Sequence, residues 1–339
     1  MTDALQNRRI VLAARPFGAP TPECFRLEAT AIPEVGEGEL LLRTRYLSLD
    51  PYMRGRMSEG SSYAEPVALD AVMCGMAVCR VEVSRAAGFA VGDHVMAFTG
   101  WQDYAVVGSE GLIKLDAEAA PLSWYLGVLG MPGLTAYVGL LDIGKPKPGE
   151  TVVVAAATGP VGATVGQIAK LKGCRVVGIA GGSEKCDYAV SELGFDACLD
   201  HYREDLPQQL AEACGQGIDI YFENVGGHVL EAVVPHLNLG ARVPVCGLIA
   251  WYNLTAAPGG PDLSPALMRA VLTRRLTVQG FIVSDHQYRC PAFIADMSGW
   301  LKAGRLKCRE DIIVGLQHAP NALIGLLKGS NFGKVVVRI

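Results

Sequence analysis

Two tyrosines in this sequence have the chemistry to act on a reactive carbonyl group. Tyr52 lies in SLDPYMRG and Tyr252 in CGLIAWYN, and both segments carry loop signals. A phenol with a pKa of about 10 keeps its proton at neutral pH, so either hydroxyl can donate a hydrogen bond to an oxygen that gains negative charge. A tyrosine taken alone is more often a half-buried packing residue, so the surrounding motifs must decide between the two interpretations.

A glycine-rich turn occupies residues 155–167, which read AAATGPVGATVGQ. The turn follows the apolar run TVVV and opens a helix-like stretch, which is the order of a dinucleotide-binding turn. Amide N–H groups at the start of such a helix face the pyrophosphate charge. Ala157 stands where the usual fingerprint has its first glycine, so a packing turn without nucleotide is the alternative. The residues expected to bind the pyrophosphate are Gly159, Pro160, Val161 and Gly162.

The end of the next expected strand indicates which nucleotide is bound. An NAD site carries an acidic residue there, roughly 20 residues after the turn. This chain has Gly181, Gly182 and Ser183 instead, and then Lys185. A hydroxyl and an ammonium suit a 2′-phosphate, which predicts NADP(H). Alternatively, Ser183 caps the next helix and Lys185 is solvated, and the two roles of Ser183 are compatible.

A catalytic zinc ion would need a Cys and a His, with a third Cys or acid, converging on one metal. Cys74 and Cys79 are five positions apart on an expected strand, so their side chains should point to opposite faces. His94 falls in GDHV, which we interpret as a turn between strands. We therefore expect no metal site.

Two regions of different character must position these residues. Residues 8 to about 120 hold short apolar or alternating runs broken by Gly and Pro, which predicts a β-rich domain. From Thr151 on, strands alternate with helices, which predicts a parallel sheet covered on both faces. Pro235 lies in a helical pattern and Pro244 in a strand pattern, so both elements should be kinked or short. From about Met297 we expect one helix and then a closing strand that returns to the first domain.

Composition narrows the class of protein further. A chain of 339 residues suggests two domains, and a net charge of -4 argues against nucleic acid and acidic membranes as partners. The uncharged stretch 151–169 is rich in Ala and Gly and holds Pro160, so we expect no membrane span there. The N-terminus lacks the apolar core of a signal peptide, and the ten cysteines lack metal or redox spacing. We therefore expect a cytoplasmic protein with reduced thiols.

Eight segments in order along nearly the whole chain resemble the medium-chain dehydrogenase/reductase superfamily. More narrowly, they resemble its zinc-independent branch of prostaglandin reductases, leukotriene hydroxydehydrogenases and alkenal double-bond reductases. The segments are YLSLDPYMRGRM, MPGLTAY, AAATGPVGATVGQIAKLKGCRVVGIAGG, GFDACLD, YFENVGG, VCGLIAWYN, GFIV and NFGKVVV. LDPYMR stands where the superfamily has its zinc-ligand segment, in agreement with the absence of a metal site.

The resemblance implies an α/β fold in which a Rossmann-type doubly wound parallel sheet is joined to a β-rich, GroES-like catalytic domain. Residues 1–123 would form the catalytic domain and residues 124–296 the dinucleotide-binding domain. Residues 297–339 would return to the catalytic domain. A homodimer is a further expectation from the family.

The resemblance also implies further contacts with NADPH. Thr135 is similar to a residue that flanks the nicotinamide, and Asn224 would lie at the mouth of the cofactor cleft. The family often has FNY where this chain has His201 followed by Tyr202, and which of the two contacts the 2′-phosphate stays open. The remaining expected contacts are Cys246, Gly247, Leu248, Ile249 and Tyr252 beside the nicotinamide half, Phe281, Ile282 and Val283 at the carboxamide, and Asn331.

The implied activity is the reduction of the carbon–carbon double bond of an enal or enone, a small-molecule substrate. Hydride from NADPH would reach the β-carbon, and Tyr52, Tyr252 or the ribose 2′-hydroxyl of the cofactor would stabilise the enolate. Apolar side chains would exclude water, and the candidates, each equally suited to a core, are Tyr46, Met53, Met131 and Trp251. The alternatives are a quinone reductase of the same superfamily, a zinc alcohol dehydrogenase, and a non-catalytic NADP(H)-binding protein.

Overall fold

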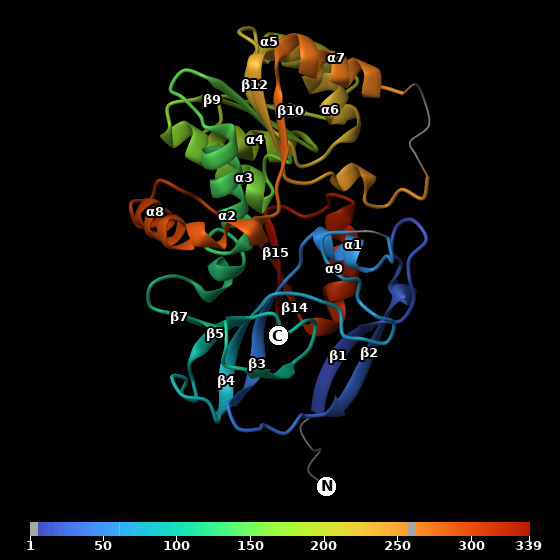
Figure 1. Ribbon diagram of the computed structural model, residues 1–339, viewed down its shortest axis with the longest axis vertical. Helices are drawn as coiled ribbons and strands as arrows, with labels where there is room; N and C mark the ends of the chain where they lie inside the picture. Colours follow the sequence, from blue (N-terminus) through green and yellow to red (C-terminus); the bar gives the residue numbers. More distant parts are fainter. Residues whose placement is uncertain (1–5, 61, 257–261) are drawn as a thin grey trace. The chain divides into compact units, whose positions relative to one another are not determined.

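The computed structural model describes residues 6–60, 62–256 and 262–339. The chain divides into two compact units (Figure 1). Unit 1 combines Met1–Gly127 with Glu310–Ile339, and unit 2 is Val128–Arg309. Unit 2 includes the whole of helix α8 (Cys290–Lys302). The domain division at 1–123, 124–296 and 297–339 stays our proposal.

A seven-stranded sheet forms the framework of unit 1. Six strands follow the order β14-β15-β3-β4-β5-β7, and β6 pairs with β3. Two further strands, β1 and β2, form a separate antiparallel pair. The strands are β1 (Gln6–Leu12), β2 (Phe25–Ala31), β3 (Glu39–Ser48), β4 (Ala77–Ser84), β5 (His94–Ala97), β6 (Tyr104–Gly108), β7 (Ile113–Leu115), β14 (Glu310–Val314) and β15 (Lys334–Arg338). The helices of unit 1 are α1 (Tyr52–Arg56) and α9 (Ala319–Leu327).

The last residues of the chain lie inside the sheet of unit 1. Strand β15 runs antiparallel to β3, with Val336 opposite Ser48, and parallel to β14 on its other side. Val335, Val336 and Val337 are buried, as expected for a strand with neighbours on both sides. The expected closing strand is therefore confirmed, whereas β14 is a strand that the sequence did not predict.

Unit 2 contains a six-stranded parallel sheet in the order β10-β9-β8-β11-β12-β13. This is the order 3-2-1-4-5-6 of a doubly wound dinucleotide-binding sheet, so the predicted fold class is confirmed. The strands are β8 (Thr151–Ala155), β9 (Arg175–Ala180), β10 (Ala197–Asp200), β11 (Ile218–Phe222), β12 (Leu237–Val245) and β13 (Thr277–Gly280). The helices are α2 (Met131–Val138), α3 (Pro160–Leu171), α4 (Ser183–Ser191), α5 (Leu206–Ala213), α6 (Gly227–Val233), α7 (Ser264–Arg274) and α8.

Alternate residues of the central strands pack against different helices. Val153 and Val177 share a core cluster with side chains of α5 and α6. On the other face, the Phe195 ring lies against Gly178 of β9 and Gly166 of α3. This alternation follows from the two-residue repeat of a strand and covers both faces of the sheet.

The two prolines had different effects. Helix α6 ends at Val233, and Pro235 lies in the following 3-10 turn, so the expected shortening is confirmed. Strand β12 instead has nine residues and includes Pro244, so it is not short. The Pro244 carbonyl accepts a hydrogen bond from the Glu223 N–H at 3.0 Å, so the residue still contributes to the ladder without an N–H of its own.

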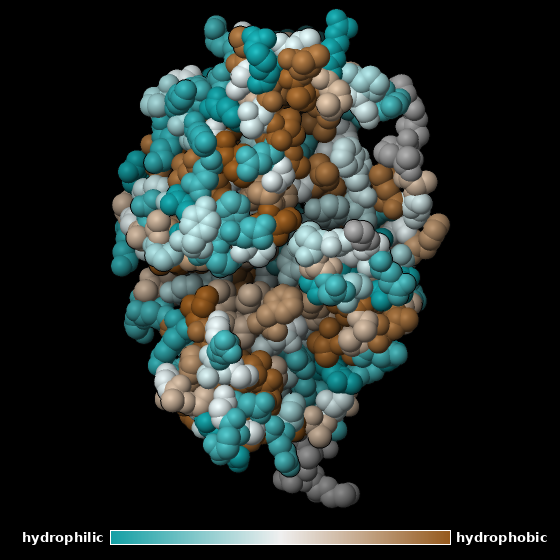
Figure 2. All heavy atoms as spheres, viewed as in Figure 1, coloured by the Kyte–Doolittle hydropathy of each residue, from teal (hydrophilic) through white to brown (hydrophobic). Residues whose placement is uncertain are grey.

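Hydrophobic side chains are exposed on part of unit 2. Met268 and Leu272 of α7 and Val278 of the edge strand β13 are among them. Figure 2 shows hydrophobic surface over this region. Within the described ranges, no helix has both the length and the apolar character needed to cross a membrane.

Candidate active site

The glycine-rich turn connects β8 to α3 at the carboxyl end of the parallel sheet. Ala156 takes a left-handed conformation with φ of 53°, and its carbonyl accepts a hydrogen bond from the Gly159 N–H at 3.0 Å. Pro160 is the first residue of α3, a position that suits its fixed φ. The first N–H groups of a helix have no intrahelical partners, so they can bind an anion.

Close packing explains the glycines and the alanine of this turn. A Cβ atom on Gly162 would lie 2.3 Å from the Ala156 carbonyl oxygen, so no side chain fits there. Ala157 is fully buried, and its methyl group would lie 2.8 Å from a Cβ on Gly178 of the neighbouring strand. The methyl group at the usual first glycine position is thus accommodated because Gly178 has no side chain.

The next turn, between β9 and α4, carries the side chains predicted for the 2′-phosphate. Gly182 has a φ of 89°, and its N–H donates to Asp200 Oδ1 at 2.8 Å. Gly182 occupies the cap position of α4 and Ser183 is the first residue of the helix, so Ser183 is not its cap residue. Ser183 lies at the same end of α4 as Lys185.

His201 follows β10 and lies beside this turn. Its Nδ1 atom is buried and has no hydrogen-bond partner. Burial lowers the pKa of His201, and the charges of His228 and Lys185 lower it further. The Tyr202 ring is tilted against the His201 ring, with 4.4 Å between their centroids, and covers Gly181, where a Cβ atom would meet the Tyr202 ring at 2.8 Å. A buried nitrogen without a partner close to a lysine charge fits an anionic group such as a 2′-phosphate.

One acidic side chain, Glu223, and one amide side chain, Asn224, make hydrogen bonds just after the end of β11. Asn224 donates from Nδ2 to the Ala155 carbonyl at 2.8 Å, which links β11 to the start of the glycine-rich turn. Glu223 accepts hydrogen bonds at Oε1 from the N–H groups of Val225 (2.6 Å) and Gly226 (2.9 Å). Its Oε2 atom is buried without a partner near the Tyr221 hydroxyl, and burial raises the pKa of Glu223. Sequence reasoning gave Glu223 no role.

The segment after β12 folds back on itself around Tyr252. The N–H groups of Cys246 and Gly247 donate to the Glu223 carbonyl at 2.9 and 3.3 Å. The Tyr252 hydroxyl accepts a hydrogen bond from the Leu248 N–H at 3.4 Å. Burial raises the pKa of Tyr252, so its hydroxyl is protonated at neutral pH. Tyr252 therefore has a hydrogen to donate.

The other predicted contacts in unit 2 lie on α2 and after β13. The Thr135 hydroxyl donates to the Met131 carbonyl at 2.8 Å, within its own helix. Phe281 is buried edge-on to Phe222, with 6.4 Å between ring centroids. Gly139 allows this pair to pack, because a Cβ atom there would lie 2.6 Å from the Phe281 ring.

Tyr52 and Asn331 belong to unit 1. Tyr52 is the first residue of α1 and packs against the core of the unit. Burial raises the pKa of Tyr52, and the Asp50 charge raises it further, so this hydroxyl is also protonated at neutral pH. Asn331 donates from Nδ2 to the Gly333 carbonyl at 2.8 Å.

The residues considered for zinc occupy different environments from those expected. Cys74 precedes β4 and does not lie on the strand, whereas Cys79 lies within β4 near the hydroxyls of Thr44 and Thr99. His94 begins β5 and is not in a turn. Among the described residues, no group of three or more His, Cys, Asp or Glu side chains could hold a metal ion.

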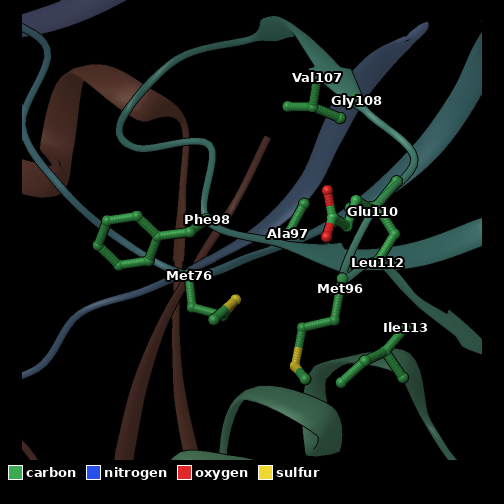
Figure 3. A pocket seen from close by; sticks show the side chains of 10 residues that line it. Met76, Met96, Ala97, Phe98, Val107, Gly108, Glu110, Leu112 and Ile113 are labelled. Carbon is green, nitrogen blue, oxygen red and sulfur yellow. The ribbon is translucent and has the colours of Figure 1, made fainter. Parts of the chain in front are cut away.

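A hollow of about 380 Å³ lies on unit 1 (Figure 3). Of the four proposed wall residues, Met53 is fully buried in the core of unit 1. The others, Tyr46, Met131 and Trp251, are not among the described lining residues of the hollow. These are Met76, Met96, Ala97, Phe98, Val107, Gly108, Glu110, Gly111, Leu112 and Ile113.

Comparison with known protein families gives one match in each of the two units. Residues 8–115 match the family described as "N-terminal domain of oxidoreductase", and residues 160–298 match "Zinc-binding dehydrogenase". The first match lies within unit 1 and the second within unit 2.

Several known proteins are similar over nearly the whole chain. The chain is 58% identical to the NADPH-dependent curcumin reductase of Escherichia coli, over 98% of this chain and 97% of the relative. It is 40% identical to the 2-alkenal reductase (NADP(+)-dependent) of Nicotiana tabacum, over 100% of this chain and 99% of the relative. The solved structure of CurA from Vibrio vulnificus in complex with NADPH aligns with a TM-score of 0.95 and 58% identity, over 98% of each chain.

The chain therefore belongs to the medium-chain dehydrogenase/reductase superfamily, in its zinc-independent branch. It is an oxidoreductase. The cofactor expected from the sequence, NADPH, is the one bound in the Vibrio vulnificus structure.

Proposed function

We propose that the protein is an NADPH-dependent reductase of the carbon–carbon double bond in α,β-unsaturated aldehydes and ketones. The observation that carries this proposal is the group formed by Ser183, Lys185 and His201 beside the glycine-rich turn of unit 2. The names of the relatives, which include a curcumin reductase and a 2-alkenal reductase, support the choice of substrate.

Residues of unit 2 would bind and select the cofactor. The first turn of α3, from Pro160 to Gly162, would receive the pyrophosphate on its N–H groups. Lys185 and His201 would bind the 2′-phosphate, and the absence of an acidic residue at 181–183 removes the repulsion that favours NAD. When bound, NADPH supplies the hydride for the β-carbon of the substrate.

A protonated tyrosine would stabilise the negative charge that forms on the substrate oxygen. Both Tyr52 and Tyr252 are held in the protonated form by burial, so both have the required donor. A donor that meets the oxygen only as charge develops lowers the barrier more than it tightens substrate binding. The cofactor ribose 2′-hydroxyl is the third candidate, and the α-carbon would take its proton from solvent.

The first experiment follows NADPH oxidation with a medium-chain trans-2-alkenal, beside NADH and with a strong chelator present. Turnover that prefers NADPH and resists the chelator supports the proposal. Activity with quinones and none with the enal would assign a quinone reductase instead. Loss of activity with the chelator would contradict zinc independence, and cofactor binding without any turnover would indicate a non-catalytic binding protein.

Replacement of each tyrosine by phenylalanine tests which hydroxyl acts on the substrate. If one of the two hydroxyls donates to the substrate oxygen, we expect its substitution to lower kcat about 100-fold with little change in KM. A single oxyanion donor contributes on that order. The other variant serves as the matched control, because the substitution is the same. If Tyr52→Phe and Tyr252→Phe both retain full kcat, the ribose hydroxyl is the remaining candidate.

We also propose that the protein is a cytoplasmic homodimer. The four residues of edge strand β13 are exposed, which leaves a strand edge and nearby apolar side chains to pair with a second copy. The structure contains no disulfide among its ten cysteines, as is usual in a reducing compartment. Light scattering of the purified protein measures the oligomeric state directly, and a monomeric mass would contradict the dimer.

A further inference from the structure

Lys334 and Asp50 form an ion pair in the interior of unit 1. The Lys334 Nζ atom lies 2.8 Å from Asp50 Oδ1, and the two side chains are only 3% and 5% exposed. Removing two charges from water is costly, and such a pair gives stability only when its remaining hydrogen bonds are also made. The pair joins β15, at the end of the chain, to the segment that follows β3.

The ion pair fixes three consecutive residues ahead of α1. Besides Asp50, Lys334 Nζ donates to the Leu49 carbonyl at 2.7 Å. The Ser48 hydroxyl donates to the other carboxylate oxygen of Asp50. The backbone adds a hydrogen bond from the Leu49 N–H to the Val335 carbonyl at 3.3 Å. The segment 48–50 is thus held through both its backbone and its side chains.

Tyr52 depends on this segment because α1 begins there. The Asp50 carbonyl accepts the Met53 N–H at 3.1 Å, and the helix has five residues and no capping hydrogen bond from a side chain. Forming a first helical turn is unfavourable by itself. A helix of only five residues therefore takes its direction from its surroundings. The position of Asp50 therefore helps to set the direction of the Tyr52 side chain, together with the packing of Tyr52 against the core of unit 1.

We propose that Lys334 is a positioning residue, which aims the Tyr52 hydroxyl at the substrate oxygen by holding Asp50 and Leu49 in place. This inference rests on the proposed function, in the form in which Tyr52 is the donor. A well-packed apolar pair would stabilise the unit as well as the ion pair does, but it would not orient the Leu49 carbonyl and the Asp50 carboxylate. Lys334 acts through Tyr52 and has no contact with substrate in this role.

A double-mutant cycle between Lys334→Met and Tyr52→Phe tests the proposal. The measurements are kcat and KM for NADPH-dependent reduction of a trans-2-alkenal. We expect each single variant to lose at least about tenfold in kcat, and the double variant to be no slower than Tyr52→Phe, because Lys334 has no further effect once the hydroxyl is gone. Losses that multiply in the double variant would overturn the proposal, and so would full kcat in Lys334→Met.

A second variant separates positioning from folding, since Lys334→Met leaves the buried Asp50 without its partner of opposite charge. Asp50→Asn combined with Lys334→Met removes both charges and is expected to fold, with a melting temperature near that of the wild type. We expect its kcat to remain at least about tenfold low, and full kcat in this variant would overturn the proposal. Lys307→Met is the control, because Lys307 pairs with Glu192 on the exposed surface of unit 2, and its kcat should match the wild type.

The same assays distinguish failure of this proposal from failure of the proposed function. No turnover of enals or enones by the wild type would overturn both. Turnover by the wild type with an unchanged kcat in Tyr52→Phe would keep the reductase activity and overturn the role of Tyr52 and of Lys334. Turnover with independent effects of the two substitutions would overturn the role of Lys334 alone.

Discussion

Lys185 and His201 come from different elements, α4 and the turn after β10, and we propose that both bind the 2′-phosphate of NADPH. Because a 2′-phosphate is absent from NADH, substitutions at these positions should affect the two cofactors differently. We expect Lys185→Ala and His201→Asn each to weaken NADPH binding about tenfold or more, since a charge-assisted hydrogen bond is lost, and to leave NADH binding unchanged. Fluorescence titration of both cofactors measures this, and equal losses for NADH would contradict a phosphate contact.

Glu223 carries a buried carboxylate whose effect on stability depends on pH. Because burial raises its pKa above the unfolded value, the native state holds this proton more tightly than the unfolded chain. That contribution to stability is present below the unfolded pKa and is lost as pH rises through the folded pKa. Glu223→Gln keeps an acceptor for the Val225 and Gly226 N–H groups and removes the charge. We expect the melting temperature of the variant, relative to wild type, to increase from pH 5 to pH 8, and no change would contradict the assignment.

At the scale of single residues, the sequence predicts a role only for side chains that belong to a local motif. Lys185 is a predicted 2′-phosphate contact because it comes shortly after a strand that is followed by glycines, and this role stays a prediction. The ion pair of Lys334 with Asp50 was missed because its partners are 284 positions apart and no local pattern connects them. Glu223 was missed for a similar reason, since its burial comes from packing beside Tyr221 and cannot be derived from spacing.

In the proposed cofactor site, the glycine-rich turn has the tightest backbone packing, at Gly162. Gly162→Ala would place a methyl group 2.3 Å from the Ala156 carbonyl, so the turn must shift. We expect this variant to lose NADPH affinity and to unfold at a lower temperature than the wild type. Gly299→Ala is the matched control, because Gly299 lies within α8 with open space at its Cβ position. That variant should be slightly more stable, by about 0.5–1 kcal/mol, through helix propensity.

Elements of regular pattern were predicted well, and short or irregular ones were not. The alternation of strands and helices after Thr151 gave the parallel sheet, because its central strands β8 and β9 are nearly continuous apolar runs. Strand β14 begins with Glu310 and Asp311, which hid it among polar residues. Strand β12 was expected to be kinked or short because of Pro244, but it pairs with β11 and β13 and has nine residues.

The response of the whole molecule to ligands gives a further prediction. A ligand that binds only the native state raises its stability by about 2.7 kcal/mol at 100 times the dissociation constant. We therefore expect NADPH to raise the melting temperature more than NADH at equal concentration. A strong chelator should change neither the melting temperature nor the activity. Thermal scans with each addition measure this, and a destabilising effect of the chelator would indicate a structural metal.

The position of β15 also has a consequence for how the chain is made. The strands that begin unit 1 leave the ribosome first, but the sheet cannot be completed until residues 334–338 have been added between β14 and β3. Unit 2 is continuous in sequence and can fold during synthesis, since domains generally fold as units in the order of their appearance. The nascent protein would thus hold a finished nucleotide-binding unit while β3 still has an open edge. Tyr52 would reach its working position only after residues 334–338 have been translated.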